Sequence, residues 1–396
     1  MNYSTIVLKR GKESSLKRLH PWIFSGAIAR KESEPALGDP VQIRGADNTL
    51  LGTGLWEGGS IAVRMMSFDG DVIDEELFFQ RISAAWKLRQ SLGLAESGDT
   101  NAFRLVHGDG DGLPGLIIDW YDGHAVMQAH SYGIYRFGET IAKALAQVAG
   151  PRLKLLYDKS AHCLGGRRLP DIENRYLFYH GNPVAEYDVL ESGHRFHVNW
   201  EEGQKTGFFL DQRENRRLVQ NLAQGRRVLN AFSYSGGFSI YALKGAARQV
   251  LSVDSSSHAL DMMERNITDN NVEENHQALQ SEVMPVLKER GRDFDFIILD
   301  PPAFAKHKSA RHQAVQGYKR LNHAAISAVP AGGFVMTFSC SQVVGNDLFE
   351  GAVRAAAIES GRRVQILARL SQGADHPVSI YQPEGEYLKG LLLHIR

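Results

Sequence analysis

The chain has 396 residues and a formal net charge of zero, with 45 basic and 45 acidic side chains. Domains run to roughly 100–200 residues, so we expect two or three of them. A composition with 43% hydrophobic and 23% charged residues excludes a disordered chain and a generally basic coat for nucleic acid.

The two cysteines, Cys163 and Cys340, are too few for a disulfide framework, and no C-x-x-C spacing suggests a zinc site. The N-terminus begins with a short apolar stretch, expected to be a strand, followed by charged residues; this order differs from that of a signal peptide. No apolar run approaches the ~18 residues of a membrane span. The sequence therefore predicts a cytoplasmic protein with no metal site and no membrane partner.

Residues 1–74 contain strand-sized pieces separated by glycines, as in GDPVQIRGADNTLLGTGLW, and this spacing predicts a small β-barrel. The stretch HPWIF, residues 20–24, is expected to form a short helical turn. Residues 1–31 carry seven basic side chains and one acidic one, a local excess that can attract phosphate. The side chains expected to make that contact include Lys9, Arg10, Lys17 and Arg18.

Residues 75–190 predict a mixed α+β domain. The stretch DEELFFQRISAAWKLRQSLG has apolar residues at helical spacing after an acidic start, which indicates a helix. Strands are expected on both sides of the Gly- and Asp-rich turn in FRLVHGDGDGLPGLIIDWYDG. The stretch YRFGETIAKALAQVAG predicts a second helix that ends at a glycine.

Residues 191–396 alternate strand-like and helix-like segments. Strands are expected in RRVLNAF, QVLSVDSS, FDFIILDPP and GGFVMTFSC, with helices between them. This alternation predicts a mostly parallel, doubly wound sheet of the Rossmann type, whose ligands bind at the carboxyl ends of the strands.

The stretch VLNAFSYSGGFS, residues 228–239, leads from a strand through a Gly-rich turn into a helix. Glycines let the backbone approach a ligand, and the helix N-terminus offers free N–H groups. The spacing fits neither the G-x-G-x-x-G fingerprint nor a P-loop. A tight turn without a ligand is the alternative. Asp254, which ends the next strand, is suited to ribose hydroxyls, although it can also be a helix N-cap.

Two further strand ends carry reactive or rigid groups. Asp300 ends an apolar strand, and two prolines stiffen the loop behind it. Such a loop can hold a planar base while Phe304 offers a stacking face; a structural turn is the alternative. Cys340 ends another strand of the same sheet, where a thiolate can be stabilised by helix N-termini. Both cysteines can also be small buried hydrophobes, and this is the expectation for Cys163.

In this order and spacing, NAFSYSGGFS, VDSS, ILDPPAFAK and FSCSQ resemble the S-adenosylmethionine-dependent RNA cytosine-C5 methyltransferases. GQKTGFFLDQRENR resembles the segment before their nucleotide fold, and the N-terminal part resembles an RNA-binding PUA domain. The likeness covers essentially the whole chain. It implies a multi-domain α/β protein with a PUA-like β-barrel at 1–74, a central α+β domain at 75–190 and a Rossmann-like class I methyltransferase domain at 191–396.

The resemblance implies S-adenosyl-L-methionine as cofactor and 23S ribosomal RNA as partner, and it leaves a homodimer open. Cys340 would be the nucleophile, and Asp300 would orient the target base together with Pro301, Pro302 and Phe304. The cofactor would be bound by Lys205, Phe208, Asp211, Arg213, Asn230, Phe232, Ser235, Gly236, Gly237 and Asp254.

This sequence departs from the family pattern at two places. The Asp300-Pro-Pro-Ala-Phe loop lacks the second cysteine that some relatives use in product release. An acidic residue contacts adenine in many relatives, and the nearest match here is Ser281-Glu282, so either Ser281 or Glu282 fills that role. Methylation of an exocyclic amine or another atom of RNA is one alternative function. A catalytically inert RNA-binding assembly factor is another, and a small-molecule methyltransferase is a third.

Overall fold

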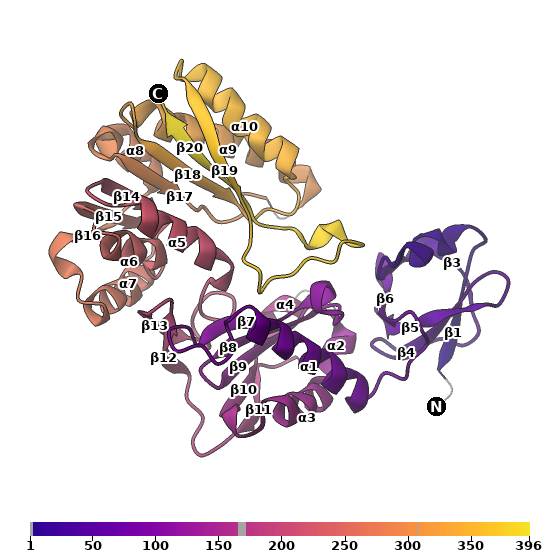
Figure 1. Cartoon of the computed structure of the whole chain (residues 1–396). Coiled ribbons are helices and arrows are strands. Elements are labelled where there is room, and N and C mark those ends of the chain that lie inside the picture. The colour runs from indigo at the N-terminus through magenta and orange to yellow at the C-terminus, as the bar shows by residue number, and fades with distance from the viewer. Residues whose placement is uncertain (1–2, 165–171, 306) are drawn as a thin grey trace. The chain divides into compact units, whose positions relative to one another are not determined.

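The computed structural model describes residues 3–164, 172–305 and 307–396. These residues form two compact units (Figure 1). The first comprises Met1–Val189, Val198–Leu210 and Ala374–Gly385, and the second comprises Leu190–His197, Asp211–Gly373 and Glu386–Arg396. The boundaries of the three predicted domains stay predictions.

An N-terminal sheet of six strands opens the first unit, in the order β2-β6-β5-β4-β1-β3. It is antiparallel except for the parallel pair of β1 with β4. A small apolar core, including Ile6, Val41 and Val63, lies inside it. The strands are β1 (Ser4–Leu8), β2 (Trp22–Phe24), β3 (Ile28–Lys31), β4 (Pro40–Arg44), β5 (Leu50–Trp56) and β6 (Ile61–Ser67).

The expectation of a helical turn at residues 20–24 is wrong. Trp22–Phe24 is strand β2, and it pairs antiparallel with β6 through Ile23 and Val63. The backbone N–H of Met65 also donates to the carbonyl of Pro21 at 2.8 Å. Long-range strand pairing therefore determines the secondary structure of this stretch, which is too short to show a hydrophobic periodicity of its own.

A second sheet of five strands, β11-β10-β9-β8-β7, continues the first unit. The helices α1 and α3 pack against each other, and their apolar faces share one core with the sheet. Asp74 caps α1, since its side chain accepts from the N–H of Leu77 at 3.1 Å. The elements are α1 (Glu75–Ser91), β7 (Ala102–His107), β8 (Leu116–Tyr121), β9 (His124–Ala129), α2 (Tyr132–Arg136), α3 (Gly138–Ala149), β10 (Leu155–Asp158), α4 (Ala161–Leu164) and β11 (Arg175–Tyr179).

The chain passes repeatedly between the two units. The strands β12 (Glu186–Glu191) and β13 (His194–Asn199) form a two-stranded sheet at the first passage. Residues 374–385, far along the chain, belong to the first unit. There the Asp375 carboxylate accepts from the backbone N–H of Arg104 at 3.0 Å, and the Arg89 guanidinium donates to the Asp375 carbonyl at 2.7 Å.

The second unit is built on a seven-stranded sheet in the order β16-β15-β14-β17-β18-β20-β19. Its first five strands are parallel, and β20 runs antiparallel to both β18 and β19. This is the predicted Rossmann-like sheet, and the predicted fold class is confirmed. The strands are β14 (Arg227–Ala231), β15 (Gln249–Asp254), β16 (His276–Gln280), β17 (Phe296–Leu299), β18 (Phe334–Ser339), β19 (Val364–Leu370) and β20 (Lys389–Ile395).

Helices cover both faces of this sheet, as in Figure 1. Helix α5 packs on α6, which contacts α7, while α9 packs on both α8 and α10. Central strands such as β17 are buried along their whole length, which explains their unbroken apolar sequence. The helices are α5 (Arg213–Leu222), α6 (Gly237–Lys244), α7 (Ser257–Asp269), α8 (Val283–Arg290), α9 (Arg311–Ala328) and α10 (Asn346–Glu359).

Candidate active site

The carboxyl ends of the parallel strands meet at one edge of the large sheet. Ala231 at the end of β14 pairs with Val253 on one side and with Leu299 on the other. Leu299 in turn pairs with Thr337 of β18. The residues that follow these positions therefore share an edge, which we call the catalytic edge. They are the glycine turn at 232–237, Asp254, Ser281, Asp300 and Cys340.

The glycine turn at 232–237 has a strained, compact backbone. Phe232 and Tyr234 have positive φ angles of 61° and 46°, and Gly236 has 81°. A Cβ atom at Gly236 would lie 2.5 Å from Cγ of Met263, and one at Gly237 would lie 3.0 Å from Cδ of Arg216. Glycine is therefore required at Gly236 by both conformation and space. Helix α6 begins at Gly237, the last residue of this turn, so its first N–H groups lie at the catalytic edge.

Asp254 holds the glycine turn in place. Its carboxylate accepts from the backbone N–H of Tyr234 at 2.9 Å and from that of Ser256 at 3.0 Å. The N-cap of α7 is Ser256, whose side chain accepts from the N–H of Ala259. The alternative of Asp254 as a helix N-cap is therefore excluded. A carboxylate has about four lone-pair sites, so two N–H donors leave capacity for further hydroxyl donors.

Polar side chains are buried behind the turn. Asn230 is 1% exposed, and its side-chain N–H donates to the Ser239 hydroxyl at 2.8 Å. Among the described residues, its Oδ1 has no hydrogen-bond partner. Ser235 is also buried, and its carbonyl accepts from Asn266 at 2.9 Å. A buried acceptor left open in a polar turn is compatible with a bound polar ligand.

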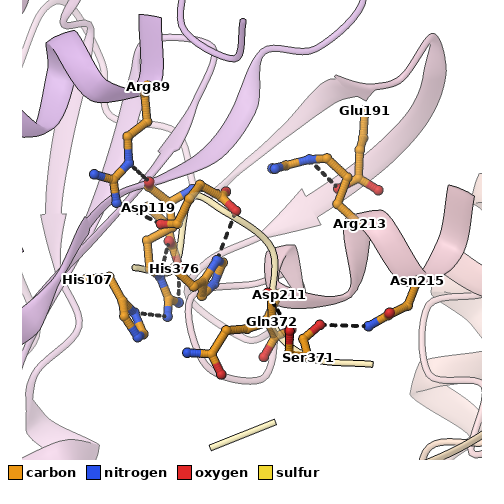
Figure 2. A network of polar contacts seen from close by, with 12 residues as sticks. Arg89, His107, Asp119, Glu191, Asp211, Arg213, Asn215, Ser371, Gln372 and His376 are labelled. Carbon is orange, nitrogen blue, oxygen red and sulfur yellow. Dashed lines mark hydrogen bonds and ion pairs between the residues drawn. The ribbon is translucent and has the colours of Figure 1, made fainter. Parts of the chain in front are cut away.

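The segment that leads into α5 reaches the same edge. The Gln212 amide donates to the Asp300 carboxylate at 3.1 Å, and the Tyr387 hydroxyl donates to Asp211 at 2.6 Å. Arg213 is buried and forms an ion pair with Glu191 at 3.4 Å, which Figure 2 shows. These contacts fix Asp211 and Arg213 beside the strand end that carries Asp300.

The proline loop after β17 presents a ring at its tip. Pro301 is buried and Pro302 is exposed, while Phe304 is 37% exposed. The Phe304 ring lies 4.6 Å, centroid to centroid, from that of Tyr318 in α9. One face of Phe304 is therefore supported from inside. Burial, together with the nearby charges of Cys340 and Asp300, raises the pKa of Tyr318 to about 12, so its hydroxyl stays protonated.

Cys340 directly follows β18, and the residue is half-buried and thus partly accessible to solvent. Ser341, the residue after Cys340, holds the loop in place because its hydroxyl donates to the Ala305 carbonyl at 2.7 Å. The buried Lys389 ammonium donates to the carbonyls of Ser341 and Tyr387, both at 2.8 Å. The loop of Cys340 is thus tied to the proline loop and to β20.

The environment of Lys389 also bears on Cys340. Burial lowers the pKa of Lys389, whereas the charges of Cys340 and Glu386 act to raise it. The charges of Lys389 and Cys340 therefore attract each other. The other cysteine differs: Cys163 lies on α4 of the first unit, and burial raises the pKa of its thiol to about 11.

Some predicted residues belong to the first unit. Lys205 is exposed with a positive φ of 50°, and its ammonium lies 4.4 Å from the centroid of the Phe209 ring. Phe208 is buried. The predicted RNA contacts Lys9, Arg10, Lys17 and Arg18 are all exposed on the N-terminal sheet and its turns. The cofactor role of Lys205 and Phe208 stays a prediction.

The adenine contact stays open between two residues. The backbone N–H of Ser281 donates to the Asp254 carbonyl at 3.0 Å, which places Ser281 at the catalytic edge. Glu282 is exposed and directly precedes α8.

Four contact residues at this edge were not predicted from the sequence: Gln212, Tyr318, Tyr387 and Lys389. Gln212 lies inside the quoted GQKTGFFLDQRENR stretch and could have been found there. Tyr387 and Lys389 lie 47 and 49 residues after Cys340, and no local pattern marks them. They reach the edge because β20 inserts antiparallel beside β18.

Comparison with known proteins agrees with this geometry. A family model described as S-adenosylmethionine-dependent methyltransferase matches residues 103–378, and one described as PUA-like domain matches residues 6–68. The chain is 41% identical over 398 residues to ribosomal RNA large subunit methyltransferase I of Aeromonas salmonicida, covering 99% of each chain. This chain belongs to that methyltransferase family. The Escherichia coli (strain SMS-3-5 / SECEC) relative of the same name is 38% identical over 98% of this chain and 99% of its own.

Solved structures show the same fold. A Streptococcus mutans protein assigned as a SAM-dependent methyltransferase superposes with a TM-score of 0.84 at 23% identity, covering 98% of this chain and 99% of its own. The predicted S-adenosylmethionine-dependent ribosomal RNA methyltransferase family, its cofactor and the PUA-like N-terminal domain are confirmed. No helix in the part of the chain that the structure describes has the length and apolar character needed to cross a membrane. The same described residues contain no cluster of metal-binding side chains.

Proposed function

We propose that this methyltransferase modifies C5 of a cytosine in 23S ribosomal RNA through a covalent adduct with Cys340. The observation that carries the proposal is the position of Cys340: a half-buried cysteine at the catalytic edge, directly after strand β18, which pairs with the strand that Asp300 follows. The relatives named above are large subunit ribosomal RNA methyltransferases, which supports ribosomal RNA as the substrate.

The residues at the edge fit S-adenosylmethionine. Asp254 is oriented by two backbone N–H groups and retains lone pairs for the ribose hydroxyls. Gly236 and Gly237 add no side chain where the turn meets the start of α6, and Oδ1 of Asn230, which has no hydrogen-bond partner among the described residues, lies on the strand before the turn. When bound, S-adenosylmethionine supplies an electrophilic methyl group on a sulfonium sulfur.

C5 of cytosine is a poor nucleophile and has to be activated before it can accept a methyl group. Cys340 can provide this activation. A thiolate that adds to C6 converts C5 into an enamine-like carbon, which can accept a methyl group. A base then takes the C5 proton, the ring double bond forms again and the Cys340 thiolate leaves. This is covalent catalysis, which divides one difficult step into easier ones.

Asp300 is suited to hold the pyrimidine during this addition. Gln212 fixes its carboxylate at 3.1 Å, and Pro301 follows it directly, so its orientation is restricted. We assign it the hydrogen bond to the ring edge that supports protonation of N3 during attack. The exposed face of Phe304 is available to stack on the extruded base.

The N-terminal domain would supply RNA affinity. Lys9, Arg10, Lys17 and Arg18 are exposed, so they can neutralise phosphates without a desolvation cost. Changing all four to Ala should weaken RNA binding and make it less dependent on salt, while S-adenosylmethionine affinity stays the same. Equal loss of both affinities would indicate misfolding and contradict this assignment.

A mechanism-based trap tests the proposal. RNA that contains 5-fluorocytosine has no C5 proton to lose, so the thiol mechanism leaves a stable protein–RNA adduct. Wild type and the Cys163→Ala control should form the adduct in the presence of S-adenosylmethionine, and Cys340→Ala should not. Methyl transfer without any adduct would favour an exocyclic amine as the target. Failure to bind S-adenosylmethionine would favour an inert RNA-binding assembly factor.

A further inference from the structure

A hollow of about 470 Å³ lies between α8, α9 and α10 on the second unit. Its apolar floor includes Met284, Leu287 and Ala324, and basic side chains stand around it. The full lining is Met284, Leu287, Lys288, Arg292, Lys319, Arg320, His323, Ala324, Ser327, Ala328 and Glu359.

The charge of this lining is strongly one-sided. Four Lys and Arg side chains face one carboxylate, Glu359, which already pairs with Lys319 at 2.6 Å. Lys288, Arg292 and Arg320 are exposed, and no ion pair or hydrogen bond of their side chains is found among the described residues. Three uncompensated cations therefore surround one hollow in a chain whose formal net charge is zero.

This hollow is not part of the catalytic edge. Helices α8 and α9 begin near the carboxyl ends of the parallel strands and run back towards their amino ends, as crossover helices must. The basic residues come from the end of α8, the turn after it and the second half of α9. The hollow therefore lies towards the opposite edge of the sheet from Asp254, Asp300 and Cys340.

We propose that this hollow, with Lys288, Arg292 and Arg320 at its rim, binds the phosphate backbone of the substrate RNA. Guanidinium groups present planar, paired donors that match phosphate oxygens, and exposed ammonium groups add charge without cost of burial. The apolar floor suits a sugar or the edge of a base. The inference rests on the proposed function only in taking RNA as the substrate; it does not depend on which atom is methylated.

RNA is the favoured occupant because it supplies regularly spaced anions to cations for which the described residues provide no partner. A phosphate contact releases condensed counterions, so each one adds about 0.7–0.9 to the slope of log affinity against log salt. Three contacts should add about 2 to 3. Between 50 and 200 mM salt this slope corresponds to about a 20- to 50-fold loss of affinity that a variant without the contacts would not show.

The test compares two triple variants with equal loss of charge. The first is Lys288→Gln, Arg292→Gln and Arg320→Gln. The control is Arg195→Gln, Lys244→Gln and Arg248→Gln, which removes three exposed cations from β13 and the α6 side of the sheet. Affinity for a protein-free fragment of 23S ribosomal RNA is measured by fluorescence anisotropy at several salt concentrations. Melting temperature and S-adenosylmethionine affinity report on the fold of both variants.

We expect the first variant to lower the salt slope by about 2 to 3 and the control to lower it by less than one. Equal slopes for the two variants would overturn the inference. If the triple variant does not fold, Arg320→Gln alone should lower the slope by about one, and an unchanged slope would overturn the inference in the same way. RNA binding is measured directly, so the two proposals can fail separately. If the 5-fluorocytosine trap fails but the triple variant lowers the salt slope, the proposed chemistry is rejected and the RNA-binding role of this hollow is retained.

Discussion

Replacing Gly236 by Ala should damage the glycine turn at 232–237 more than an ordinary glycine substitution would. Gly236 has φ of 81°, and an alanine Cβ would lie 2.5 Å from Cγ of Met263. The left-handed conformation costs an alanine about 1–2 kcal/mol. Overpacking against Met263 adds about 1–3 kcal/mol. We therefore expect a destabilisation of about 2–5 kcal/mol, which lowers the melting temperature by roughly 5–15 °C.

A matched control separates the two contributions. Gly332 has φ of 85°, but no heavy atom lies within 4 Å of its ideal Cβ position. Gly332→Ala should therefore lose only about 1–2 kcal/mol and bind S-adenosylmethionine like the wild type. Gly236→Ala should lose at least tenfold in S-adenosylmethionine affinity, a ratio that corresponds to about 1.4 kcal/mol. Calorimetric titration and thermal melting measure both. Identical melting and cofactor affinity in the two variants would refute the reasoning.

Three further changes probe other parts of the molecule. Cys340→Ala should keep the S-adenosylmethionine affinity and abolish methyl transfer, and a cytosine-methylating Cys340→Ala protein would contradict the covalent role. Lys389→Met removes two hydrogen bonds, to the carbonyls of Ser341 and Tyr387, so it should lower the free energy of unfolding by about 2–3 kcal/mol, which urea unfolding measures; an unchanged stability would contradict this role. Burial raises the pKa of Asp158 to about 6, so the ionised form opposes folding. The stability that its protonated form contributes is present below pH ~4 and is lost as pH rises through 6. Urea unfolding should therefore find Asp158→Asn more stable than wild type by up to about 3 kcal/mol at pH 8 and equal at pH 4; a difference independent of pH would be inconsistent with this cause.

The large sheet, and the edge at which Asp254, Asp300 and Cys340 gather, were predictable because parallel strands leave a clear pattern in the sequence. Each buried strand is an apolar run, and Asp254, Asp300 and Cys340 each stand at the end of one. Parallel pairing then brings these ends together without any further information. The glycine turn was equally visible, since positive φ angles and close approach require glycine at Gly236.

The contacts that fix these residues were not predictable in the same way. Gln212 reaches Asp300 across 88 positions of the chain, and Tyr387 reaches Asp211 across 176. Lys389 is an ordinary-looking lysine in the sequence, and only the antiparallel insertion of β20 buries it beside Ser341. Such long-range contacts form only in the completed fold, and no local sequence pattern indicates them.

The basic hollow could not be predicted from the sequence for a related reason. Lys288, Arg292 and Arg320 are spread over 33 positions, and each is typical of a solvent-facing helix or turn. Packing of α8 on α9 brings them together. The basic side chains of residues 1–31, by contrast, lie close together in the sequence, so their excess of charge is recognisable from the sequence alone.

The central claim is that the sulfur of Cys340 directs the methyl group to a ring carbon. Its most direct test is nucleoside mass spectrometry with chromatographic standards, after purified protein has reacted with labelled S-adenosylmethionine and unmodified 23S ribosomal RNA. We expect label in 5-methylcytidine with wild type and none with Cys340→Ala. Label in N4-methylcytidine or in a methylated purine, undiminished by Cys340→Ala, would contradict it.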